Sequence, residues 1–95
     1  MAYPKDELPP PDAAPHDDLA FELARIWFAG GVPQLRARTE LWPDPAAWGV
    51  VLGDVARQLA RLCAAPGDED GEAALARIRA GLDAELGGPG APDVP

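Results

Sequence analysis

The pair Gly30-Gly31 divides one apolar stretch of the chain, FELARIWFAGGVPQLRAR, into two short runs. Both runs contain aromatic and branched side chains that favour strands. Two consecutive glycines can take the positive φ angles of a two-residue hairpin turn. Such a turn also sets which residues face each other. The sequence therefore predicts an antiparallel β-hairpin centred on this pair.

The turn predicts one apolar hairpin face. We expect it to contain three cross-strand pairs together with Phe28: Ala29 with Val32, Ile26 with Leu35, and Ala24 with Ala37. This face can pack on helices. Pro33 lacks an N–H, and in this register its position points to the outer edge, where proline is tolerated.

The opposite hairpin face is the first candidate site, formed by Arg25, Trp27, Arg36 and Arg38. Arg25 and Arg36 face each other, which is unfavourable unless a negative group lies nearby. A phosphate, a carboxylate ligand or an acidic partner would fit this face. Alternatively, it is simply solvated, or it is neutralised by residues 1–18, which contain five acidic residues.

The segment DPAAWGVVLGDVARQLARLC, residues 44–63, predicts an amphipathic helix. Asp44 is a typical N-cap, and Pro45 suits the first helical position. Trp42 precedes the cap, where an apolar side chain can pack on the first turns. Spacings of three and four predict a core-facing stripe headed by Trp48, followed by Val51, Leu52, Val55, Leu59 and Leu62.

Small residues form a second stripe on this helix: Gly49, Gly53, Ala56 and Ala60. Two glycines inside a helix cost about 1 kcal/mol each, which suggests that another backbone approaches closely. The stripe either seats another element of the same chain or forms, with Trp42, an interface between two subunits.

A second helix is predicted to start within residues 65–71 and to end at Gly87-Gly88. Its apolar stripe is Leu75, Ile78, Leu82 and Leu86. The predicted fold class is α+β, a ββαα domain over residues 19–87. The flanking residues 1–18 and 88–95 are rich in proline and predicted to be disordered.

The hairpin, the segment LWPDPAAWGVVLGDVARQLAR and the later segment EAALARIRAGLDAE together resemble a family of small bacterial proteins, domain of unknown function 5076. The resemblance covers about residues 19–86 and is most specific from Trp42 to Arg61. It implies the ββαα order. It transfers no functional residues, because the family has no established activity.

Composition argues against several functions. The net charge of −8 disfavours nucleic acid and anionic membranes. The chain contains no Ser or Asn, and its single His, Lys and Tyr all lie within residues 1–18, so a nucleophile and base are hard to pair. GDEDGE, residues 67–72, fails as a calcium loop because Pro66 and Arg77 would occupy ligand positions. We therefore expect no catalytic site, cofactor or metal.

The expected protein is non-enzymatic and cytoplasmic. Its core is small, and the helices can cover only one face of the hairpin. Both features favour a homodimer, which could act as an adaptor for another protein. The alternative is a regulatory module that binds a small anion on the arginine face.

Overall fold

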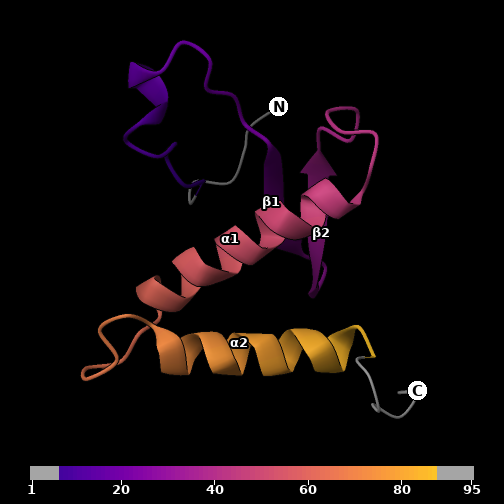
Figure 1. Ribbon diagram of the computed structural model, residues 1–95. Helices are drawn as coiled ribbons and strands as arrows, with labels where there is room; N and C mark the ends of the chain where they lie inside the picture. The colour runs from indigo at the N-terminus through magenta and orange to yellow at the C-terminus, as the bar shows by residue number, and fades with distance from the viewer. Residues whose placement is uncertain (1–6, 88–95) are drawn as a thin grey trace. The chain divides into compact units, whose positions relative to one another are not determined.

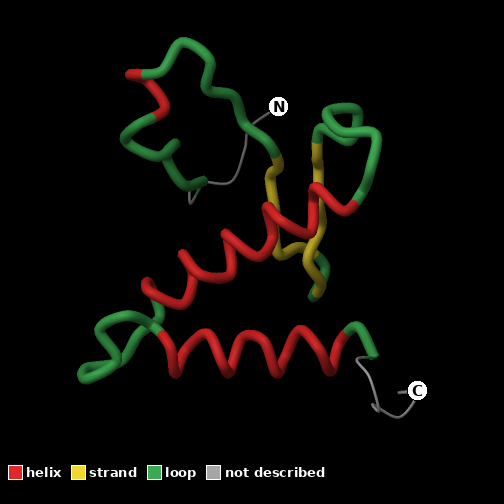
Figure 2. Tube along the Cα trace, in the orientation of Figure 1, coloured by secondary structure: helices red, strands yellow, loops and turns green. Residues whose placement is uncertain are grey.

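The computed structural model describes residues 7–87. In chain order the elements are a 3-10 turn, η1 (Ala14–His16), strands β1 (Ala24–Ala29) and β2 (Val32–Ala37), and helices α1 (Ala46–Leu62) and α2 (Glu72–Glu85) (Figures 1 and 2). This order confirms the predicted α+β class, a hairpin followed by two helices. The chain divides between Leu41 and Trp42 into two compact units, one with the hairpin and one with the helices.

The structure describes only part of the two tails that the sequence predicts to be disordered. Residues 1–6 and 88–95 lie outside the described part of the chain. Residues 7–18 are described, and they include η1.

The hairpin has the predicted register. Gly30 and Gly31 have φ angles of 64° and 80°, and β1 pairs with β2 so that Ile26 faces Leu35. The Arg38 N–H donates to the Leu23 carbonyl at 3.1 Å. Hydrogen-bonded pairs alternate along an antiparallel ladder, so Phe28 and Pro33 form a non-hydrogen-bonded pair. The missing N–H of proline therefore faces the outer edge, as predicted.

The predicted division of the two hairpin faces needs two corrections. Because side chains alternate along a strand, the Ala29–Val32 pair lies on the face of Arg25 and Trp27, not with Ile26. The exposures also differ from the expectation that the apolar face is the covered one: Leu23 and Trp27, on the face of Arg25, are half-buried. On the other face, the exposed fractions are 68% for Ile26, 77% for Phe28 and 64% for Leu35. The segment before β1 accounts for the half-burial of Trp27, because residues of this segment line one pocket together with it.

Helix α1 begins at Ala46, one residue after the predicted first position, Pro45. Asp44 caps its start, as predicted. The Asp44 carboxylate accepts a hydrogen bond from the Ala46 N–H at 2.9 Å, which satisfies an amide that the helix cannot. The Trp42 and Trp48 rings lie edge to face, with centroids 5.3 Å apart and planes at 80°. Trp42 thus packs on the first turns, as predicted. Trp48 is half-buried.

The loop before α2 uses its acidic residues to cap the helix. One Asp68 oxygen accepts the Ala73 N–H at 3.0 Å and the other accepts the Ala74 N–H at 3.1 Å. Asp70 accepts the Glu72 N–H at 3.2 Å. Negative charge at this end is also favoured by the helix dipole. Two of the four carboxylates of GDEDGE, those of Asp68 and Asp70, therefore accept hydrogen bonds from backbone amides.

Asp68→Ala should lower the free energy of unfolding by about 1–2 kcal/mol, because two amides of the first turn lose their acceptor. Urea unfolding followed by circular dichroism measures the loss. Glu69→Ala removes the same charge from the same loop and serves as the control, with an expected change within about 0.5 kcal/mol. Equal losses in the two variants would show that charge, not hydrogen bonding, stabilises this helix start.

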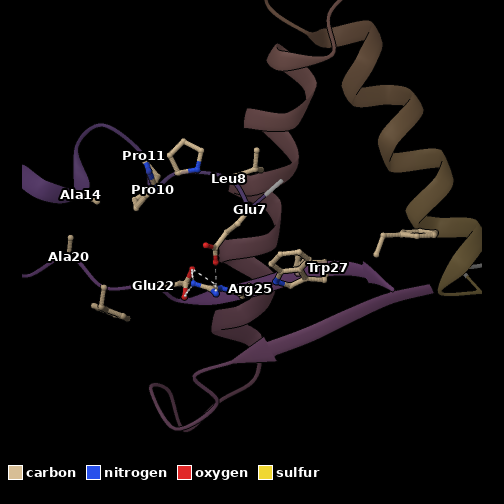
Figure 3. A pocket seen from close by; sticks show the side chains of 13 residues that line it. Glu7, Leu8, Pro10, Pro11, Ala14, Ala20, Glu22, Arg25 and Trp27 are labelled. Atoms are coloured by element: carbon tan, nitrogen blue, oxygen red, sulfur yellow. Dashed lines mark hydrogen bonds and ion pairs between the residues drawn. The ribbon is translucent and has the colours of Figure 1, made fainter. Parts of the chain in front are cut away.

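Helices α1 and α2 meet at the ends joined by their loop and diverge from there, in both viewing directions (Figures 1 and 3). The closest approach involves Ala60 of α1, which is 1% exposed, and Gly71, which precedes α2 and is also buried. A Cβ atom at Gly71 would lie 3.0 Å from the Ala60 carbonyl carbon and 3.0 Å from the Arg61 nitrogen. The core of the helical unit is therefore centred on this joint.

Candidate functional site

Arg25 is the centre of the candidate site in the hairpin unit. Its Nη1 donates to Glu7 Oε2 at 2.8 Å. Its Nε and Nη2 donate to the Glu22 carboxylate at 3.0–3.2 Å, using both carboxylate oxygens. Figure 3 shows the two carboxylates reaching the guanidinium from different sides. The arginine therefore binds two carboxylates of its own chain.

Arg38 holds the segment that carries Glu22. Its Nε donates to the Glu22 carbonyl at 2.9 Å, and its guanidinium carbon lies 5.8 Å from the centroid of the Phe21 ring. A cation over an aromatic face is attracted to it. Arg38 thereby fixes the backbone from which Glu22 reaches Arg25.

The other two predicted members of this face differ. Trp27 follows Arg25 on the same face of β1 and is half-buried. Arg36 faces Arg25 across the ladder and is exposed. Within residues 7–87 its side chain makes no hydrogen bond or ion pair. The structure thus places carboxylates on one of the two facing arginines and leaves the other in solvent.

An open pocket of about 810 Å³ adjoins Arg25. One wall is the segment Glu7–Pro11, and the opposite wall is β1 with the residues that precede it (Figure 3). The pocket is lined by Glu7, Leu8, Pro9, Pro10, Pro11, Ala14, Ala20, Phe21, Glu22, Arg25, Ile26, Trp27 and Phe28. A cationic centre, aromatic rings and a proline-rich wall thus surround one space.

Sequence reasoning named Arg25 and Trp27 but missed Glu22 and Phe21. A local signal for Glu22 existed, because Glu22 and Arg25 are three residues apart and a side chain of either can reach the other. Glu7 entered the prediction only as one of the five acidic residues within residues 1–18. No local pattern distinguishes it, since 18 positions separate it from Arg25.

The small-residue stripe on α1, the second candidate site, divides into two parts. Ala60 is buried at the joint with α2, and Ala56 is half-buried. Gly49 and Gly53 are exposed, and a Cβ built at either position meets nothing within 4 Å among residues 7–87 apart from the adjacent residues and the local helix backbone. The carboxyl-terminal half of the stripe seats α2, whereas the amino-terminal half is open.

The neighbouring apolar stripe of α1 is also largely open. The exposed fractions are 57% for Leu52, 42% for Val55, 46% for Leu59 and 83% for Leu62. At helical spacing these side chains lie on one face, with Leu52 at the edge nearest Gly49. The prediction that they all belong to a core is wrong for these four residues, because α2 packs on the small residues instead.

No group of three His, Cys, Asp or Glu side chains within residues 7–87 could hold a metal ion. Cys63 is exposed and forms no disulfide. No helix there is long and apolar enough to cross a membrane.

Comparison with known proteins gives a family and a solved neighbour. A family model described as "Domain of unknown function (DUF5076)" matches residues 7–90. One similar solved structure is described as "a putative pyruvate dehydrogenase from the photosynthetic bacterium Rhodopseudomonas palustrus CGA009". It is 32% identical, covers 100% of this chain and 97% of its own, and has a TM-score of 0.63. No curated protein matches the chain. The family match reaches further at both ends than residues 19–86 and includes Glu7.

Proposed function

This chain belongs to the family of domain of unknown function DUF5076, and from the geometry above we propose that it acts as a non-enzymatic, cytoplasmic homodimer. In this proposal two copies associate through α1, and the dimer serves as an adaptor for another protein. The observation that carries the proposal is the open surface of α1, with four exposed aliphatic side chains on one face and two uncovered glycines on the next face.

The shape and chemistry of this surface support a second copy as its occupant. Glycines at positions 49 and 53 are one helical turn apart, and spacing of this kind lets two helix backbones approach closely. Leu52, at the edge of the aliphatic stripe nearest Gly49, would lose water on association. A two-fold dimer brings the same patch from both copies together, so one complementary stripe is enough to form the interface.

The residue composition supports the non-enzymatic part of the proposal. The chain has one Thr, one His and one Cys, and it has no Ser or Asn. The exposed, unpaired Cys63 suits a reducing compartment, where disulfides are rare. The solved neighbour's name suggests a different activity, and pyruvate oxidation by the purified protein would contradict our proposal directly.

Association is tested by analytical ultracentrifugation or light scattering of the full chain from about 1 to 100 µM, a range that spans ordinary dimer affinities. We expect a dimer mass that falls toward the monomer mass on dilution. A monomer mass at every concentration would overturn the proposal.

A further inference from the structure

We propose that the hairpin unit carries a peptide-binding surface, formed by Phe21, Arg25 and Trp27. It would recognise an extended peptide in which a glutamate is followed by prolines. Residues 7–11, Glu-Leu-Pro-Pro-Pro, are the resident occupant of this surface in the structure. The proposal does not rest on dimerisation, because it uses the other unit of the chain.

The geometry of Arg25 supplies the specificity for a carboxylate. Glu22 binds its Nε and Nη2, and this fixes the plane of the guanidinium. The Nη1 donor then points to Glu7 Oε2 at 2.8 Å. A planar guanidinium held in this way is pre-organised for a further carboxylate. Glu22 is thus the positioning residue, and Glu7 stands where a ligand carboxylate would bind.

The proline run accounts for the rest of the recognition. Proline fixes φ, so three consecutive prolines favour the extended polyproline conformation and lose little freedom on docking. Grooves lined with aromatic side chains are a common recognition surface for such segments. Here Pro9, Pro10 and Pro11 line one pocket together with Phe21 and Trp27.

The resident segment is held weakly enough to be exchanged. The side chains of Arg25 and Glu7 are 36% and 41% exposed, and partly exposed ion pairs are weak. Leu8 is 85% exposed, so this residue adds little burial. The segment competes chiefly through its covalent connection, which provides a high local concentration. A partner with the same chemistry could therefore displace it.

The test is titration of a blocked peptide, ELPPPD, into the full chain and its variants. Binding is followed by nuclear magnetic resonance of the Trp27 indole and β1 amides. Glu7→Gln weakens the resident competitor, so its affinity for the peptide should rise about tenfold over the unsubstituted chain. Asp12→Asn makes the same charge change outside the pocket and should leave the affinity unchanged.

Two further comparisons locate the contact. The peptide QLPPPD should bind the Glu7→Gln chain about tenfold more weakly than ELPPPD does. Arg25→Gln should abolish the difference between these two peptides. Arg25→Lys keeps the positive charge but loses the planar guanidinium donors, so it should retain part of the difference. Circular dichroism checks that each variant is folded. Equal affinity of the two peptides for the Glu7→Gln chain, or no gain on Glu7→Gln, would overturn the proposal.

Discussion

Gly71→Ala should be the most damaging single substitution of the helical unit, with a loss of about 3 kcal/mol or more in the free energy of unfolding. Gly71 has a φ of 75°, a region where other residues are strained by roughly 1–3 kcal/mol. The new Cβ would also lie 3.0 Å from backbone atoms of Ala60 and Arg61. Those atoms belong to a helix and cannot move singly, so α2 must shift away from α1, at a further cost of about 1–3 kcal/mol. A domain of this size has only about 3–5 kcal/mol in total.

Gly67→Ala is the matched control for this prediction. Gly67 lies in the same loop and has a φ of 93°, but apart from its two chain neighbours nothing in the described chain is within 4 Å of its Cβ position. It should therefore suffer the backbone strain alone. Urea unfolding of both variants, followed by circular dichroism, gives the difference, which isolates the close approach of α2 to α1. If the two losses are equal, the joint at Ala60 is looser than the structure shows.

Gly53→Leu should dissociate the proposed dimer while the chain stays folded. No atom of residues 7–87 is near the new side chain, and leucine is a better helix former than glycine by nearly 1 kcal/mol. In the dimer, the added volume would separate two backbones that the glycine allows to meet. Overpacking costs about 1–3 kcal/mol, which corresponds to a roughly ten- to hundredfold weaker dimer. Sedimentation gives the dimer affinity, and thermal unfolding reports on the fold.

Gly81→Leu is the control for this second prediction, because Gly81 lies in α2 and its Cβ position is equally open. It makes the same substitution in a helix outside the proposed interface, and the dimer affinity should not change. A Gly53→Leu chain with unchanged dimer affinity would move the interface away from this part of α1. Loss of folding would mean that Gly53 faces another element of its own chain.

The sequence predicted the local features well where a few neighbouring residues decide the backbone. Gly30-Gly31 gave the turn and therefore the register of the whole hairpin. Asp44 gave the helix cap, and Trp42 gave its packing on the first turns. Each of these depends on side chains within about six positions of one another. Such short-range preferences can be predicted from the local sequence alone.

The candidate sites were predicted less completely, because their partners are distant in sequence. Facing arginines correctly indicated that a negative group was needed. Several acidic residues could have supplied it, and only the path of the chain brings Glu7 to Arg25. The reversed exposure of the two hairpin faces has the same origin, since residues 7–22 lie beside Arg25 and Trp27.

The α1 surface shows the same division between what the sequence determines and what the tertiary structure decides. The sequence by itself determined that α1 has an aliphatic stripe and a stripe of small residues, because helical periodicity assigns each residue to a face. It did not determine which stripe receives α2. That was decided by the loop before α2, where Gly71 packs against Ala60. A backbone can come this close only to small residues, so α2 meets the small stripe at one end, and the aliphatic stripe stays exposed.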